Sequence, residues 1–165
     1  MVSDCLAAGT PVWTASGLVA IEKIRVGDLV LAQAPDSGEL AYKPVLKTTL
    51  RPRGPLVKVR VAGGEVFETS GGHLFWVAGE GWVKSRQLKA GQELHAAQGA
   101  VGLSQVETGR TLETHNLVVA DFHTYFVGRS RVLCHDNTIK RATHAVIPGL
   151  VRQRPLEKIR DRQTR

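Results

Sequence analysis

A pattern of residues near the amino terminus of this chain occurs a second time in the middle of the chain. Shifting the 165-residue sequence by 64 positions lays residues 5–32 on residues 69–96 without a gap. The shared pattern is Gly-x-Val, four residues, Ile or Leu, a basic residue, one more residue and Gly. Glycine is the residue that tight turns with positive φ require. The repeat therefore predicts a duplicated β unit and a pseudo-symmetric fold.

Short apolar or alternating runs between turn residues favour an all-β fold. The 17 glycines and the scarcity of long helical periodicity point the same way. We expect strands over residues 10–14, 29–32, 40–50, 56–61, 66–69, 115–119, 124–127 and 132–134. A loop is predicted at residues 52–55, which contain two prolines, and a loop or weak strand at 97–111. A short helix is expected over residues 156–162.

The net charge of +7 is concentrated at the carboxyl terminus. Residues 139–165 contain eight Lys or Arg and two Asp or Glu, so they hold +6 and the first 138 residues hold +1. A basic tail can bind nucleic acid or an anionic surface, but this one has no interleaved aromatic residues. We expect a solvated extension, with no nucleic-acid partner. No apolar run reaches the roughly eighteen residues of a membrane helix, and we expect one soluble domain.

Five chemically capable side chains stand in a row at residues 134–138, which read Cys-His-Asp-Asn-Thr. Such a run is either a polar turn that closes a strand or a reaction centre in the main chain. The two cysteines, Cys5 and Cys134, form no Cys-x-x-Cys metal or redox pair. One opens the domain and the other nearly closes it. We interpret the run as a reaction centre with Cys5 as its partner.

Five motifs follow one another along residues 5–137. They are Cys-Leu-Ala-Ala-Gly-Thr-Pro-Val at 5–12, Ile-Glu-Lys-Ile-Arg-Val-Gly-Asp at 21–28, Gly-His-Leu-Phe-Trp-Val at 72–77 with Gly-Trp-Val at 81–83, Asn-Leu-Val-Val-Ala-Asp-Phe-His-Thr-Tyr-Phe-Val-Gly at 116–128, and Leu-Cys-His at 133–135. This series resembles the Hint (hedgehog/intein) domain, in its bacterial intein-like, pretoxin branch. The resemblance implies an all-β horseshoe with pseudo-two-fold duplicated β units, whose two ends meet at the active site.

The resemblance also implies a division of the chain and an activity. Residues 1–4 are the amino-terminal flank, residues 5–137 the self-processing domain, and residues 138–165 the basic carboxyl-terminal flank. The domain acts once on its own flanking segments, by cleavage or by splicing, and releases cargo such as a toxin. No signal segment begins the chain, and we expect an excised piece of a larger secreted or surface bacterial protein. We expect no cofactor, no membrane partner and a monomer.

At the amino-terminal junction, Cys5 is the expected nucleophile. A free thiol has a pKa of about 8.5 and is strongly nucleophilic as the thiolate, so Cys5 can attack the Asp4 carbonyl and form a thioester. The leaving amide nitrogen needs a proton, and His73 as general acid would contribute about 10²- to 10⁴-fold. Without the resemblance, His73 could equally be an ordinary strand histidine.

The family carries a Thr three residues before this His, and here that position is Ser70, with Thr69 one residue earlier. Ser70 keeps the hydroxyl that holds the scissile carbonyl but lacks the methyl group that restricts the rotamer. Losing such a donor at an acyl-transfer site costs about 3 kcal/mol. The substitution bears on rate rather than on mechanism.

At the carboxyl-terminal junction, the resemblance assigns His123 to assist bond breakage. Asn116 stands where many inteins carry Asp, and an amide cannot act as a base. Related domains end in His-Asn, whereas this chain reads His135-Asp136-Asn137 followed by Thr138. If the Asn137 side chain cyclises, the bond to Thr138 breaks and Thr138 is a potential acceptor. If Asp136 takes the place of Asn, the bond before Asn137 breaks more slowly. The better nucleophilicity of an amide favours the Asn137 register.

Two further hypotheses concern regulation and loss of activity. If the ends meet, Cys134 lies near Cys5, and the two thiols could form a reversible disulfide or bind an inhibitory Zn²⁺ with His73 or His135. Alternatively, the departures at Ser70, Asn116 and Asp136–Asn137 describe a Hint scaffold that no longer processes itself and serves as a connector within a larger secreted protein.

Overall fold

The structure is a computed structural model, and it describes residues 5–138. Residues 1–4 and 139–165, which include the predicted short helix at residues 156–162, lie outside the described residues. Within the described range, twelve strands and two single-turn 3₁₀ helices follow in the order β1 Leu6–Ala7, β2 Pro11–Thr14, β3 Gly17–Ala20, η1 Ile21–Lys23, β4 Leu29–Gln33, β5 Leu40–Val61, β6 Val66–Ser70, β7 Leu74–Val77, β8 Gly81–Lys84, η2 Ser85–Gln87, β9 Glu93–Ala96, β10 Gly99–Val119, β11 Thr124–Val127 and β12 Val132–His135. The predicted all-β fold is confirmed. Nowhere in residues 5–138 does a helix reach the length and apolarity that crossing a bilayer demands.

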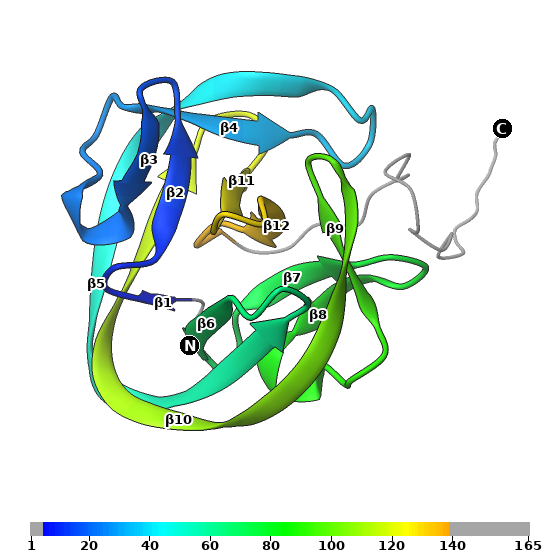
Figure 1. The fold of residues 1–165 in the computed structure, drawn as a ribbon. Helices are drawn as coiled ribbons and strands as arrows, with labels where there is room; N and C mark the ends of the chain where they lie inside the picture. The colour runs from blue at the N-terminus through cyan, green and yellow to red at the C-terminus, as the bar shows by residue number, and fades with distance from the viewer. Residues whose placement is uncertain (1–4, 139–165) are drawn as a thin grey trace, which may run out of the picture.

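Two long antiparallel strands, β5 and β10, form the curved frame of the molecule (Figure 1). Their pairing runs from Leu103 opposite Val61 to Val119 opposite Val45, with four register shifts on the way. Each bulge bends and twists a strand pair. The bulges explain how two strands of 22 and 21 residues curve round the other elements instead of forming a flat ribbon.

The predicted loop at residues 52–55 was wrong, because these residues belong to β5. Pro55 pairs with Thr111 and Gly54 with Leu112, and register shifts flank this part of the ladder. A proline cannot donate a ladder hydrogen bond and is tolerated at bulges. A loop or weak strand was predicted at residues 97–111. Most of this range is the first part of β10, which begins at Gly99.

The predicted duplication is present as two equivalent units. In the first, β2 and β3 form a hairpin that leads through η1 to β4, and in the second β7 and β8 lead through η2 to β9. The turn glycines have nearly equal φ values, +99° at Gly17 against +93° at Gly81 and +95° at both Gly27 and Gly91. Positive φ explains why both copies of the repeat keep glycine there.

The core lies between the two units, around β11 and β12 at the centre of Figure 1. All four residues of β11 and of β12 are buried. Gly128 follows β11 with φ +78°, and its carbonyl accepts a hydrogen bond from Trp13 Nε1 at 2.6 Å. A Cβ at this position would lie 2.4 Å from Cζ of Phe67 and 2.8 Å from Oε2 of Glu65. Strands β2 and β6 and the central hairpin therefore meet where no side chain fits.

His95 on β9 gives the fold a predicted pH dependence. Its Nε2 lies 2.6 Å from Oε1 of Gln33, and burial lowers the pKa of His95 below its ordinary value of about 6.5. Below about pH 6.5 the unfolded chain therefore binds a proton that the folded chain does not, and stability falls as the pH falls. We expect the melting temperature of the wild type to drop between about pH 7.5 and pH 5, and that of His95→Gln to drop less. Equal decreases in the two proteins would contradict this assignment.

Candidate active site

Cys5 immediately precedes the short strand β1, which lies between β6 and β10. Leu6 pairs with Thr69 on one side and with His115 on the other. The amide N–H of Cys5 donates to Oγ of Ser70 at 3.0 Å, and the amide of Ser70 donates to the Cys5 carbonyl at 2.9 Å. Cys5 is 1% exposed. The nitrogen of the Asp4–Cys5 bond is thus held by a buried hydroxyl.

A set of hydroxyls fixes the turn that carries Ser70 and His73. The His73 amide donates to the Ser70 carbonyl at 3.2 Å, and the Ser85 hydroxyl donates to the His73 carbonyl at 2.9 Å. Thr69 Oγ1 lies 2.7 Å from Oγ of Ser85. The His73 ring is fully buried and packs edge-on against Phe75, with ring centroids 5.0 Å apart. Ser85, in η2, was missed by the sequence reasoning, since a serine in a repeat unit carries no signal of its own.

Asn116 lies on β10 beside Cys5, because continuing the β1–β10 register from Leu6–His115 brings position 5 opposite position 116. Its Oδ1 accepts two hydrogen bonds, from the Leu117 amide at 2.7 Å and from the Tyr125 hydroxyl at 2.6 Å. Both Asn116 and Tyr125 are buried. Sequence reasoning placed Asn116 near the reaction but did not identify Tyr125, an ordinary residue for a strand.

Tyr125 and Cys134 are cross-strand partners on β11 and β12. Burial raises the pKa of Tyr125 well above its ordinary value, and the neighbouring Cys134, Asp136 and Cys5 raise it further. Cys134 is also a hydrogen-bond partner of the Tyr125 hydroxyl. The phenol therefore stays protonated and remains a donor. Cys5 and Cys134 both lie within electrostatic range of Tyr125, and both are present as buried thiols in the described residues.

The carboxylate of Asp136 is fully buried and accepts hydrogen bonds at both oxygens. Oδ2 accepts from the Val119 amide at 2.7 Å and lies 3.1 Å from Nδ1 of His123. Oδ1 accepts from the amide of Thr138 at 3.0 Å and from its hydroxyl. His123 has φ +55°, a costly conformation for a residue with a side chain, and its carbonyl accepts the Asp136 amide at 2.9 Å. Asp136 thus holds His123 at both its ring and its backbone.

His135 contacts the backbone of the residue that follows it. Its Nδ1 lies 2.8 Å from the carbonyl oxygen of Asp136. A carbonyl can only accept, so this Nδ1 carries the hydrogen in that contact. The ring is 5% exposed and packs edge-on against Trp82, with centroids 5.0 Å apart. The imidazole is therefore positioned to polarise the carbonyl of the Asp136–Asn137 peptide bond.

The predicted site residues form two groups that meet on β10. Cys5, Thr69, Ser70 and His73 form the first group. His123, His135, Asp136, Asn137 and Thr138 form the second. The amide of Asn137 donates to the Leu117 carbonyl at 2.9 Å, one residue beyond Asn116, and its side-chain Nδ2 lies 3.4 Å from Oγ1 of Thr49. Thr49 in turn pairs with Asn116 across β5 and β10.

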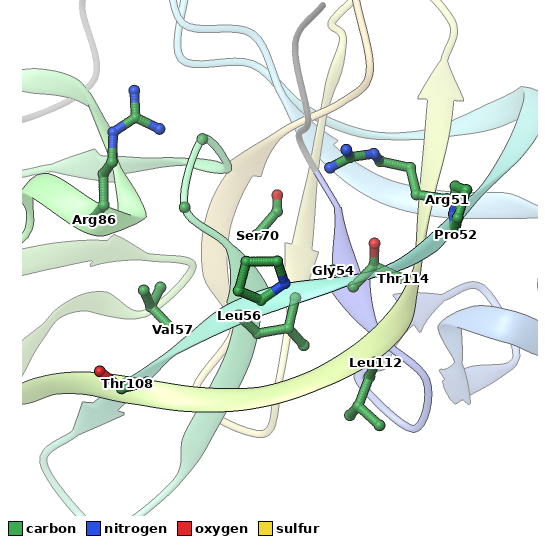
Figure 2. A pocket seen from close by; sticks show the side chains of 13 residues that line it. Arg51, Pro52, Gly54, Leu56, Val57, Ser70, Arg86, Thr108, Leu112 and Thr114 are labelled. Atoms are coloured by element: carbon green, nitrogen blue, oxygen red, sulfur yellow. The ribbon is translucent and has the colours of Figure 1, made fainter.

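A cleft of about 450 Å³ opens beside the first group. Figure 2 shows Arg51 and Arg86 on opposite sides of it, with the Ser70 hydroxyl between them. The remaining lining comes mainly from β5, β10 and the turn after β6, and among the described residues that line it none is acidic. The Ser70 hydroxyl, which accepts from the Cys5 amide, therefore lines a cleft whose charged side chains are positive.

No metal site is preformed in the part of the chain that the structure describes. Within residues 5–138, no three His, Cys, Asp or Glu side chains gather closely enough to hold a metal ion. The two groups offer a thiol, imidazoles, hydroxyls and a carboxylate.

Comparison with solved structures defines the class of protein as the Hint and intein fold. The solution structure of a bacterial intein-like domain from Clostridium thermocellum is 37% identical, with a TM-score of 0.76 over 80% of this chain and 98% of that one. A DnaB intein from Synechocystis sp. PCC 6803 is 13% identical, with a TM-score of 0.73 over 81% of this chain and 99% of that one. The zinc-bound splicing domain of the Msm DnaB1 intein is 24% identical, with a TM-score of 0.65 over 79% and 98%. The last two similarities show the fold alone.

The family profile of the pretoxin Hint domain matches residues 11–139. The chain belongs to the pretoxin Hint domain family. Comparison with curated proteins gives no match. Intein-like Hint domains process their own polypeptides, and this chain has the fold that supports such self-processing.

Proposed function

We propose that the chain cleaves its own backbone, beginning with an N–S acyl shift at Cys5. The Cys5 thiol first gives its proton to solvent, and the thiolate sulfur bonds to the Asp4 carbonyl carbon. The Asp4–Cys5 C–N bond then breaks as the departing nitrogen takes a proton from His73, which solvent reprotonates. The resulting thioester is then cleaved by water or by an external thiol. The observation that carries this proposal is the buried hydrogen bond from the Cys5 amide to the Ser70 hydroxyl, in the turn that also holds His73.

The substrate in this proposal is the segment that precedes Cys5. Residue 4 is an aspartate, and the cleft beside Ser70 carries Arg51 and Arg86. Opposite charges attract most strongly where water is partly excluded. The charge of the cleft therefore matches the residue whose carbonyl is attacked.

For the carboxyl-terminal junction we propose cleavage between Asp136 and Asn137. The sequence alone favoured cyclisation of Asn137, but the contact from His135 Nδ1 to the Asp136 carbonyl oxygen supports the other register. A carboxylate oxygen of Asp136 bonds to its own carbonyl carbon, the bond to Asn137 breaks, and the new amine receives a proton through His135. Water then opens the five-membered anhydride. No cofactor enters either step.

A connector that has lost its activity is the second candidate. The observation that favours it is the Asp136 carboxylate, whose two oxygens are both occupied by hydrogen bonds. Such a carboxylate is a weak nucleophile. In both readings the chain acts as a monomer within a larger secreted polymorphic toxin. Only in the first would self-processing release the flanking segment as cargo.

The proposed regulation through Cys5 and Cys134 requires some rearrangement. Both thiols are buried near Tyr125, so a disulfide between them would disturb its hydrogen bond with Cys134. The Msm DnaB1 intein has been crystallised with zinc. An inhibitory Zn²⁺ here would need side chains to move, since no three ligands gather in the described part of the chain.

Mass spectrometry of a precursor with both flanks, incubated with and without dithiothreitol, tests the proposal. We expect thiol-dependent scission at Asp4–Cys5 in the wild type and none in Cys5→Ala, because the thioester cannot form without the sulfur. Both proteins should melt at similar temperatures, which controls for folding. Scission before residue 5 that persists in Cys5→Ala would exclude the thioester route, and an intact wild type would support the connector.

A further inference from the structure

Asn116 has a buried amide whose orientation is fixed by two donors. The Leu117 N–H and the Tyr125 hydroxyl both meet the same side-chain atom, at 2.7 and 2.6 Å. A backbone N–H can only donate, so this atom is the oxygen and the other is the NH₂ group. Asn116 is 1% exposed, and its Nδ2 has no hydrogen-bond acceptor within the described structure. Native proteins rarely leave a buried donor in this state.

The geometry of β1 shows on which side of Cys5 Asn116 lies. The Cys5 amide points toward β6, where it meets Ser70. In a planar trans peptide the carbonyl points opposite to the N–H. The neighbour of β1 on the side away from Ser70 is β10, where Asn116 lies opposite position 5. A donor to the carbonyl side of this peptide would therefore come from β10.

A donor that lacks a partner at rest is suited to a charge that appears only during reaction. Attack by the Cys5 sulfur converts the carbonyl oxygen of residue 4 into an oxyanion. Hydrogen-bond donors prepositioned for such an oxygen stabilise the transition state and not the ground state. Tyr125 contributes by occupying Oδ1, which prevents the amide from flipping. Its raised pKa keeps the phenol a donor throughout the physiological range.

We propose that the Asn116 NH₂ group is the oxyanion donor for the N–S acyl shift, and that Tyr125 is the positioning residue that aims it. This inference rests on the proposed function at Cys5 and assigns a donor to the side of the scissile peptide opposite Ser70, whose hydroxyl accepts from the Cys5 N–H. It gives the asparagine at position 116 a role that needs an amide and not a carboxylate. An aspartate there would present a lone pair and a negative charge to the oxyanion.

Hydroxylamine trapping of the thioester tests this assignment on the full-length precursor. The rate at which the Asp4 hydroxamate appears should fall about 10²-fold in Asn116→Ala, the usual loss for one oxyanion-hole donor. Asn116→Asp should be slowed at least as much. Tyr125→Phe should be slowed less, by about tenfold, and Tyr125→Phe should have no further effect in the Asn116→Ala background. Tyr42→Phe, on the exposed part of β5, is the matched control and should react at the wild-type rate.

The outcomes separate this inference from the function on which it rests. Each variant should still melt cooperatively above the assay temperature, which a general loss of structure would not allow. A wild-type rate in Asn116→Ala overturns the oxyanion assignment while leaving the function intact. Equal slowing by Tyr125→Phe in both backgrounds overturns the positioning role. A wild type that yields no hydroxamate removes the proposed function, and this inference with it.

Discussion

Asp136→Asn is expected to accelerate cleavage between residues 136 and 137 by about a hundredfold, which corresponds to about 2.7 kcal/mol in the barrier. An amide nitrogen that attacks its own backbone carbonyl gives a succinimide, an imide comparable in energy to the peptide bond that it replaces. The wild-type carboxylate must instead form an anhydride, which the released amine readily attacks. The carbonyl under attack is the one that His135 Nδ1 contacts at 2.8 Å. Intact mass measured over hours gives both the rate and the position of the cut.

Asn137→Ala separates the two registers. If residue 136 is the reacting residue, this variant cuts at the same rate as its parent, in the wild-type and in the Asp136→Asn background. If Asn137 cyclises, the variant stops cleavage and the fragments of the wild type end at residue 137. A product that ends at residue 137 would contradict the proposed register.

Gly128→Ala is expected to lower the free energy of unfolding by about 3 kcal/mol or more. A methyl group at this position would lie 2.4 Å from the Phe67 ring, and forcing an extra carbon into a packed core costs about 1–3 kcal/mol. The φ of +78° adds a backbone cost of about 1–2 kcal/mol for a residue with a Cβ. Urea denaturation of the two proteins, with an unchanged m-value, measures the difference.

Gly38→Ala is the matched control for this prediction. Gly38 has φ +77°, nearly the same as Gly128, but an added Cβ would have no atom within 4 Å. The control should therefore show the backbone cost alone, about 1–2 kcal/mol. Equal losses in the two variants would show that the contact with Phe67 relaxes without cost.

The duplicated unit was predictable because turn geometry demands particular residues. Gly17 and Gly81 must adopt positive φ, so glycine persists in both copies and the repeat can be read from the sequence. The continuity of β5 was not predictable in the same way. Taken alone, Pro52 and Pro55 indicate a loop. Their place in a strand depends on the pairing with β10, whose bulges provide positions where no ladder hydrogen bond from the proline is needed.

The candidate site was predictable where a side chain is unusual for its local structure. Cys5 and the His-Asp-Asn run differ chemically from their neighbours, which is why they were identified, whereas His73 was identified only through the resemblance to Hint domains. Tyr125 and Ser85 were not, because a tyrosine in a strand and a serine in a turn are common. Their roles depend on strand register, which sets Tyr125 opposite Cys134 and brings its hydroxyl to Asn116.

The hydrogen bond from the Asn137 amide to the Leu117 carbonyl bears on whether a cut at this site becomes permanent. Once the Asp136–Asn137 bond breaks, that nitrogen is a free amine, yet β10 still holds it next to the acyl group it has just left. Attack of this amine on the anhydride, which restores the peptide bond, then competes with attack by water. The separation of residues 136 and 137 from each other, and not the bond-breaking step, would decide the yield of cleaved protein. A downstream segment that pulls on residue 137 would thus promote release without touching the chemistry.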